Sequence, residues 1–180
     1  MRNLKYFCVL SMLVLGILSA QAQQEELLRN GDFELNPRVE RGTQATTAWD
    51  GPKPVVVVYV DPMSQDNPYY AVIGGDTIYN AGLDGISITE GMTYDFSACL
   101  RNIPALREEE RTPGSKQIII QLVDESGKPL AEATIKAQGN HWQHYSAQLR
   151  ASTSCAKARL AIVGIGSDKI AIDKVSLKKQ

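Results

Sequence analysis

The sequence predicts an all-β protein, an antiparallel β-sandwich of two sheets, and three observations support this prediction. Apolar residues recur at every second position along most of the chain, and the helical period of 3.6 residues is nearly absent. The alternating segments are short, and turns rich in glycine, asparagine and aspartate separate them. After an N-terminal targeting segment about 158 residues remain, which is the size of one ordinary domain and too short for a (β/α)8 barrel.

Residues 1–22 have the composition of a secretory signal peptide. Arg2 and Lys5 precede an apolar run at 8–18, and the segment closes on the small-x-small sequence Ala-Gln-Ala. Because the apolar run is too short for a comfortable membrane span, we expect cleavage rather than an uncleaved anchor. The mature domain is therefore expected at 23–180, exported to the periplasm, the cell surface or the medium.

Charge and cysteine content limit the classes of partner. The formal net charge is −1, and loss of the two signal-peptide cations lowers it further, so neither nucleic acid nor an anionic membrane surface is favoured. Cys99 and Cys155 remain after cleavage, and an oxidising compartment would allow them to pair. The sequence does not show whether their Cα atoms come within bonding range, and it leaves the oligomeric state open.

The predicted strands follow one another along the mature chain. The run Val55–Val60 is continuously apolar, which is typical of a strand buried on both faces, and most of the other segments alternate. We expect strands at 27–35, 55–60, 69–73, 85–88, 94–101, 117–122, 131–138, 143–149, 158–163 and 170–177.

The connections agree with that order of strands. Glu-Ser-Gly-Lys at 125–128 predicts a tight hairpin turn, and the charged segment 102–116 predicts a solvated loop that caps one end of the sandwich. Asp76, Asn80 and Asp84 lie in a glycine-rich stretch without the spacing of an EF-hand, so we expect them to be turn residues.

The last strand requires a β-bulge. Ile170 and Ile172 share one phase of the alternation, whereas Val175 and Leu177 share the other. One extra residue near Asp173 would bring all four apolar side chains into one core and would turn the aspartate toward a neighbouring loop. The core itself is expected to close around four side chains, Phe33, Phe96, Ile120 and Ile172.

Three segments of the chain resemble a known fold family. They are Asn-Gly-Asp-Phe-Glu at 30–34, Gly-Met-Thr-Tyr-Asp-Phe-Ser at 91–97 and Ile-Asp-Lys-Val-Ser-Leu at 172–177. In order and spacing they resemble the opening, central and closing strands of the galactose-binding-like jelly rolls of the family 4/9 carbohydrate-binding modules. The resemblance implies a jelly-roll sandwich that binds carbohydrate without cleaving it.

A narrower resemblance covers further parts of the chain. Segments 80–88, 122–131 and 142–146 are similar to the module near the N-terminus of family 51 α-L-arabinofuranosidases from Bacteroides-like bacteria. The catalytic barrel of those enzymes would have to follow Leu177, three residues before the sequence ends. Segments 36–68 and 102–116 match neither family, and such variable parts usually carry ligand specificity.

The sequence predicts a protein that is not an enzyme. His141 and His144 are three residues apart, so on a strand they point to opposite faces and cannot hold one metal ion together. No arrangement of serine, histidine and acid and no H-E-x-x-H motif is present.

A structural calcium ion is an expectation of the resemblance. Jelly rolls of this family often hold one calcium between the first and last strands, and Glu34 and Asp173 are the side chains that would carry over as ligands. Calcium prefers several oxygen ligands, and loop carbonyls can supply the remainder. The alternative is that both residues are ordinary acids at strand ends.

The alternation also suggests where a sugar would bind. Aromatic rings stack on the C–H faces of sugars, and Arg and Gln pair with vicinal hydroxyls. Arg101 and Gln121 point away from the core, and they converge if their strands are neighbours in a concave sheet. The candidate aromatics at the rim of that sheet are Trp49, Tyr69 and Tyr70.

Each of these residues also has a structural interpretation. Arg101 and Gln121 would suit an ordinary polar sheet face, and Trp49 would suit a buried loop anchor. Trp142 and Tyr145 are expected to be structural residues at the edge of the sandwich.

The leading hypothesis is an exported, non-catalytic module that binds polysaccharide chains containing arabinose or xylose by aromatic stacking and hydroxyl hydrogen bonds. The alternatives are a structural or protein-interaction sandwich without a sugar site, and a detached ancillary domain of an α-L-arabinofuranosidase.

Overall fold

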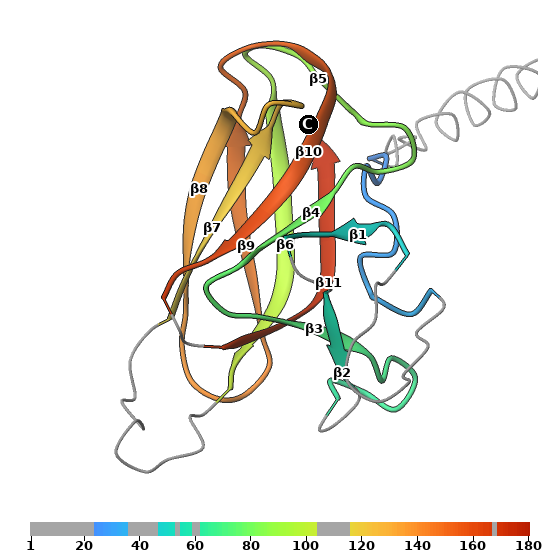
Figure 1. Ribbon diagram of the computed structural model, residues 1–180, viewed down its shortest axis with the longest axis vertical. Coiled ribbons are helices and arrows are strands. Elements are labelled where there is room, and N and C mark those ends of the chain that lie inside the picture. Colours follow the sequence, from blue (N-terminus) through green and yellow to red (C-terminus); the bar gives the residue numbers. More distant parts are fainter. Residues whose placement is uncertain (1–23, 36–46, 53–54, 59–61, 104–115, 167–168) are drawn as a thin grey trace, which may run out of the picture.

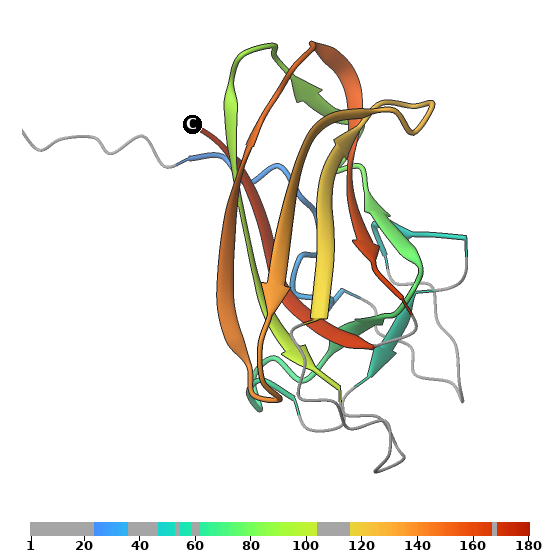
Figure 2. The same ribbon diagram turned by 90° about the vertical axis from the view of Figure 1, so that its left-hand side faces the viewer.

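The computed structural model describes residues 24–35, 47–52, 55–58, 62–103, 116–166 and 169–180. These residues form eleven strands and no helix, and the strands make two antiparallel sheets. Figures 1 and 2 show the sheets as two layers, with β8, β7, β10 and β4 in front and β9, β6 and β11 behind in the view of Figure 1. The prediction of an all-β sandwich is confirmed. The described part of the chain has no helix of the length and hydropathy that crossing a membrane requires.

The front layer is a six-stranded sheet in the order β1-β4-β10-β7-β8, and β5 also pairs with β10. The strand bounds are β1 (Trp49–Asp50), β4 (Thr77–Asn80), β5 (Ile86–Ile88), β7 (Lys116–Val123), β8 (Pro129–Ala137) and β10 (Cys155–Gly164).

The back layer is a five-stranded sheet in the order β2-β3-β11-β6-β9. The strand bounds are β2 (Val56–Val58), β3 (Tyr70–Ile73), β6 (Thr93–Asn102), β9 (Gln143–Arg150) and β11 (Ile170–Lys179).

Strand β6 shows how the alternation builds the core. Its burial pattern alternates without a break over ten residues, with the even-numbered residues buried from Tyr94 to Asn102. Phe33, Phe96, Ile120 and Ile172 all belong to one buried cluster, as expected. Burying one such side chain contributes roughly 1.5–3 kcal/mol, so the burial of the whole cluster drives the closure of the two sheets.

The predicted β-bulge in the last strand is present. The register between β11 and β6 shifts between Asp173 and Ser176, and Lys174 has a φ of 49°. Both halves of β11 therefore bury their apolar side chains, and Asp173 is fully buried.

The predicted first strand at 27–35 is wrong. In the described residues this segment contains turns and bends, because Asn30 and Phe33 have φ values of 56° and 59°, which no extended strand accommodates. Near its start Glu26 forms an isolated bridge with Lys178, and the Leu27 amide donates to the Leu177 carbonyl. Phe33 still reaches the core because the turn directs its side chain inward.

Two strands were not predicted. β1 and β4 pair with each other, and β4 also pairs with β10. Asn80, expected in a turn, ends β4 and is fully buried, where its Nδ2 donates to the Arg29 carbonyl and its Oδ1 accepts from the Gly82 amide. Asp84 lies in a turn as expected.

Other predictions meet different outcomes. The turn at 125–128 is confirmed, because the Asp124 amide donates to the Lys128 carbonyl and the Gly127 amide to the Asp124 carbonyl. Cys99 and Cys155 are free thiols on strands of different sheets. The signal peptide at 1–22, most of the loop at 102–116, and the last two residues of the predicted strand at 55–60 lie outside the described residues.

Candidate functional site

The outer face of the five-stranded sheet carries a set of polar and aromatic side chains in register. Leu100 and Ile172 face the core, so their strand neighbours face outward. The register pairs Asp173 with Cys99 and Cys99 with His144, which places these three in one row across β11, β6 and β9. One row further along, Ala171 pairs with Arg101.

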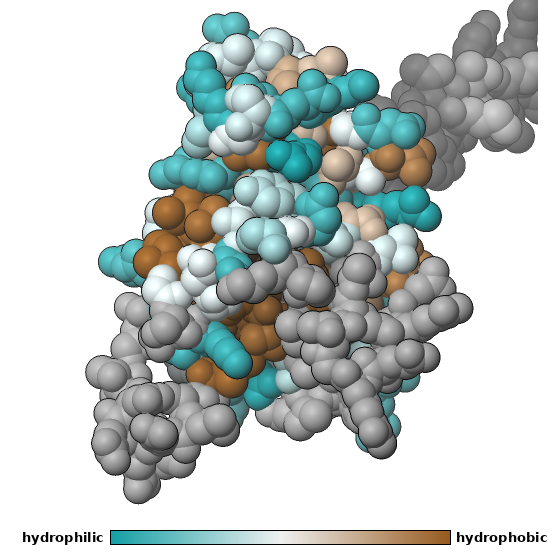
Figure 3. Space-filling model, viewed as in Figure 1, coloured by the Kyte–Doolittle hydropathy of each residue, from teal (hydrophilic) through white to brown (hydrophobic). Residues whose placement is uncertain are grey.

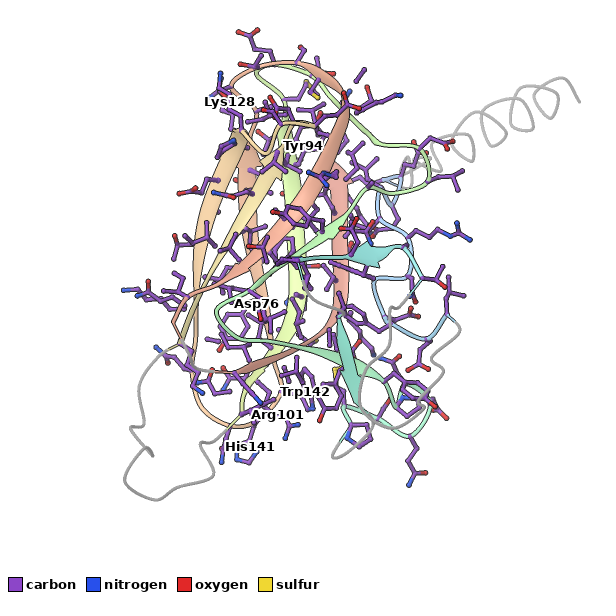
Figure 4. All side chains as sticks on the ribbon, in the orientation of Figure 1. Asp76, Tyr94, Arg101, Lys128, His141 and Trp142 are labelled. Atoms are coloured by element: carbon purple, nitrogen blue, oxygen red, sulfur yellow. The ribbon has the colours of Figure 1, made fainter. Side chains whose placement is uncertain are left out.

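Arg101, Tyr70 and Trp142 form a compact group that we call the Arg101 cluster. The Arg101 guanidinium carbon lies 5.5 Å from the ring centroid of Tyr70 and 5.2 Å from that of Trp142. Its Nη2 donates to the Tyr70 hydroxyl at 3.2 Å. The two rings meet edge to face, with centroids 5.2 Å apart and planes at 78°. Figure 4 shows Arg101 and Trp142 next to each other at the lower end of the sandwich.

Trp142 supplies the accessible aromatic surface of this cluster. Tyr70 is only 4% exposed, whereas Trp142 is half-buried. The Trp142 Nε1–H is buried and has no hydrogen-bond partner in the described part of the chain. The guanidinium on one side fixes the indole, because a cation over an aromatic face is attracted by roughly 0.5–2 kcal/mol.

A polar groove of about 580 Å³ lies on the same face of the sheet. Its polar lining comes from β6, β9 and β11: Asp95, Ser97, Ser146, Gln148, Ser176 and Lys178. The carboxylate of Asp95 accepts from Gln148 Nε2 at 3.2 Å and from Gln180 Nε2 at 2.8 Å. Carboxylate, amide and hydroxyl groups in this arrangement can both donate to and accept from the hydroxyls of a polyol.

The sequence did not predict the groove or the contact between Trp142 and Arg101. The alternation of β6 and β9 already placed Asp95, Ser97, Ser146 and Gln148 on outward positions, which was the available signal. Trp142 precedes β9, outside the alternating pattern, so no periodicity marked it.

The structure brings some predicted site residues together and separates others. Arg101 and Tyr70 are in contact, whereas the side chain of Tyr69 packs against the core cluster and its amide donates to Glu34 Oε1. The expected convergence of Arg101 and Gln121 is wrong, because β6 and β7 belong to different sheets. Gln121 points outward on the opposite layer, where its Nε2 donates to Glu132 at 2.6 Å.

Trp49 is a buried anchor at the start of β1 rather than a platform at the rim. It is 3% exposed, its Nε1 donates to the Asn30 carbonyl at 2.7 Å, and its ring lies 5.0 Å from that of Phe33. Tyr145 is structural as expected, because it packs against the core and its hydroxyl accepts from the Gln138 amide at 2.8 Å.

The two predicted metal ligands lie near each other beside the bulge. Asp173 Oδ2 accepts from Asn67 Nδ2 at 2.8 Å, Asp173 Oδ1 from the Lys174 amide at 2.7 Å, and Glu34 Oε1 from the Tyr69 amide at 2.8 Å. The pKa of Asp173 is raised to about 7, chiefly by burial and to a small extent by the nearby charge of Glu34, against the charge of Lys174 and hydrogen bonds from the Lys174 amide and Asn67, which lower it. Two carboxylates that repel each other in this way would gain from a cation between them.

Side chains alone supply only part of the oxygen ligands that a calcium ion needs. Within the described residues no group of three or more His, Cys, Asp and Glu side chains could hold a metal ion. Glu34 and Asp173 would therefore bind calcium with backbone carbonyls or water as the other oxygen ligands. A hollow of about 750 Å³ beside them is lined by Asp32, Glu34, Asp66 and Asn67 among other residues, so oxygen atoms are at hand.

The row of His144, Cys99 and Asp173 does not form an activated nucleophile. Burial, with the charge of Asp173 second, raises the pKa of the Cys99 thiol. A raised pKa keeps the thiol protonated near neutral pH, whereas nucleophilic cysteines require the thiolate.

Comparison with known proteins identifies the fold. No protein-family model and no curated protein matches the chain. An arabinose-bound GH51 α-L-arabinofuranosidase superposes with a TM-score of 0.68 at 18% identity, over 86% of this chain and 26% of that one. The CBM22-1 xylan-binding domain of Paenibacillus barcinonensis Xyn10C superposes with a TM-score of 0.55 at 10% identity, over 87% of this chain and 95% of that one. A CBM4 structure superposes with a TM-score of 0.52 at 13% identity, over 85% of this chain and 99% of that one.

These similarities show that the chain has the jelly-roll fold found in carbohydrate-binding modules. The chain spans about a quarter of the arabinofuranosidase and nearly the whole of the two smaller proteins. At identities below a fifth the similarity concerns the fold, because one fold hosts many functions.

Proposed function

We propose that this protein is a non-catalytic carbohydrate-binding module that holds polysaccharide chains containing arabinose or xylose. The observation that carries the proposal is the Arg101 cluster, which shares the outer face of the five-stranded sheet with a polar groove. An aromatic surface beside hydroxyl-pairing groups is the combination that sugar recognition needs.

Binding would proceed without bond cleavage. Trp142 would stack on the C–H face of one sugar ring, with Arg101 holding the indole in place. Asp95, Gln148 and the groove serines lie four to six residues along the strands from the Arg101 cluster, so they would pair with hydroxyls of rings further along the same polysaccharide chain. The choice of arabinose or xylose is supported by the jelly-roll neighbours, one arabinose-bound and one xylan-binding.

Two further elements belong to this proposal. A calcium ion bound by Glu34 and Asp173 would fix the turn at 30–35 to the bulge of β11, and its role would be structural. The N-terminal segment would direct export to the periplasm, the cell surface or the medium, where polysaccharide is encountered.

Two rival functions have observations in their favour. The burial of Trp49 and Tyr70 leaves few exposed rings among the described residues, which favours a structural or protein-interaction sandwich without a sugar site. The TM-score of 0.68 with a quarter of an arabinofuranosidase favours a detached ancillary domain of such an enzyme. An adjacent reading frame that encodes a catalytic barrel would support the second rival.

Calorimetric titration with arabinoxylan oligosaccharides tests the proposal. We expect millimolar or tighter binding by the native protein, and binding weaker by about tenfold in Trp142→Ala, because a lost aromatic stack is worth roughly 1 kcal/mol or more. Arg101→Ala should weaken binding as well. Gln121→Ala, on the outer face of the other sheet, is the matched control and should bind normally.

Absence of binding by the native protein at millimolar ligand would exclude the sugar hypothesis in favour of the structural rival. If Gln121→Ala lost as much affinity as Trp142→Ala, the sugar site would not lie on the outer face of the five-stranded sheet.

A further inference from the structure

A second, smaller cavity lies on the opposite layer. It has a volume of about 230 Å³ and lies among β1, β4, β10 and the turns next to β1 and β4, with Ala48, Asp50, Tyr79 and Arg159 in its wall. Leu160 and its partner Asn80 face the core, so Tyr79 and Arg159 face outward. Polar and apolar residues are mixed over this face, which is turned to the viewer in Figure 3.

Arg159 is the unusual group in this cavity. Its guanidinium carbon lies 4.6 Å from the centroid of the Tyr79 ring. Its Nε is buried and has no hydrogen-bond partner in the described residues. A buried donor without a partner costs about 1–3 kcal/mol, and native proteins rarely retain one without a reason. A ligand that draws the guanidinium into the cavity and accepts hydrogen bonds from its N–H groups would offset that cost.

The cavity wall includes a strained residue. Ala48 has a φ of 70°, in the left-handed region that residues with a Cβ rarely adopt. Such strain costs of order 1–3 kcal/mol and persists only where the surroundings impose it. Here the anchored side chain of Trp49 holds the turn, and β1 then presents the exposed Asp50 at the cavity.

We propose that this cavity binds one carboxylate-bearing sugar residue, a uronic acid unit. The guanidinium fork would bind the carboxylate through two parallel hydrogen bonds. Asp50 would accept from ring hydroxyls, while the small apolar wall at Ala48 and Ala81 would lie against ring C–H groups. The volume is below the range of roughly 300–1,000 Å³ typical of larger ligands, so the cavity suits one ring.

Asp50 also discriminates among anions. A doubly charged phosphate would be repelled by this carboxylate more strongly than a singly charged uronate. The proposed site is independent of the Arg101 cluster, because the two lie on outer faces of different sheets.

Backbone amide NMR titration tests the site with methyl β-D-glucuronide, its uncharged methyl ester and inorganic sulfate. We expect the acid to shift amides at 48–50, 79–82 and 159, and the ester to bind about tenfold more weakly because the ionic pair is lost. Arg159→Gln should weaken the binding of the acid by the same factor of about ten. The matched control is Lys157→Gln, which removes an exposed charge from the same strand and should leave binding unchanged.

Three outcomes would overturn the proposal: no shifts at these amides, equal affinity for acid and ester, or sulfate binding as tight as the acid. If Arg159→Gln fails to fold, Arg159→Lys keeps the charge without the fork, and the acid–ester comparison on the native protein still decides. Arabinoxylan binding by Arg159→Gln is measured in parallel, so failure of one site is distinguishable from failure of the other.

Discussion

Asp173 shows how one extra residue in a strand changes the chemistry of a side chain. The β-bulge turns its carboxylate away from solvent and toward Asn67, and burial then raises its pKa to about 7. An unfolded aspartate has a pKa near 3.9, so between about pH 4 and pH 7 the native state binds a proton that the unfolded state releases. Stability from this residue is therefore fully present below about pH 4 and is lost progressively as the pH rises to about 7.

Replacing Asp173 with Asn should remove this pH dependence. In calcium-free buffer with a chelator, the free energy of unfolding of the native protein relative to Asp173→Asn should fall as the pH rises from 4 to 7, by up to a few kcal/mol, and then level off. Urea denaturation at several pH values measures it. Asp84→Asn changes the same charge at an exposed position and is the control. If the native protein instead became more stable relative to Asp173→Asn as the pH rises from 4 to 7, the raised pKa of Asp173 would be wrong.

At the scale of strands, alternation predicted what depends on local pattern and missed what depends on tertiary contacts. β6, β7 and β9 were found within one or two residues because one face of each is buried. The segment 27–35 was predicted as a strand because nothing in the local sequence marks the positive φ of Phe33. In the structure Phe33 packs against Trp49, a contact between segments that the local pattern does not show. Alternation also assigns an outward side without assigning a sheet, so Arg101 and Gln121 could not be separated.

The contact between the turn at Gly31 and the bulge of β11 makes a testable element-scale prediction. The Val175 amide donates to the Gly31 carbonyl at 2.8 Å, and a Cβ on Gly31 would clash with the Val175 carbonyl oxygen. Gly31→Ala should cost roughly 2 kcal/mol or more, because backbone atoms must move apart. Thermal denaturation measures the loss of stability.

Gly91→Ala is the control. Nothing lies within 4 Å of the added Cβ, so this change should cost only about 1 kcal/mol for its positive φ. Equal effects at both positions would contradict the close packing.

At the scale of the whole molecule, each outer face of the sandwich carries one of the two proposed sites, and each site combines segments that are distant in sequence. The Arg101 cluster joins residues from β3, β6 and the approach to β9, and the Arg159 cavity joins β1, β4 and β10. Tyr70 and Arg101 could be selected from the sequence as an aromatic and an outward cation. Trp142 and Arg159 could not, because their roles arise from contacts between segments distant in sequence.

Calcium would act on the molecule as a whole, because Glu34 and Asp173 connect the N-terminal turn to the last strand. A ligand at 100 times its Kd stabilises the native state by about 2.7 kcal/mol, and for a domain of this size each kcal/mol raises Tm by about 2–4 °C. At pH 7.5 we therefore expect calcium to raise Tm by several degrees over chelator-treated protein. Glu34→Gln and Asp173→Asn should each abolish that rise, and magnesium, which accepts irregular oxygen sites reluctantly, should produce little of it. A rise that survives both substitutions would place the ion elsewhere, and no rise in the native protein would remove the site.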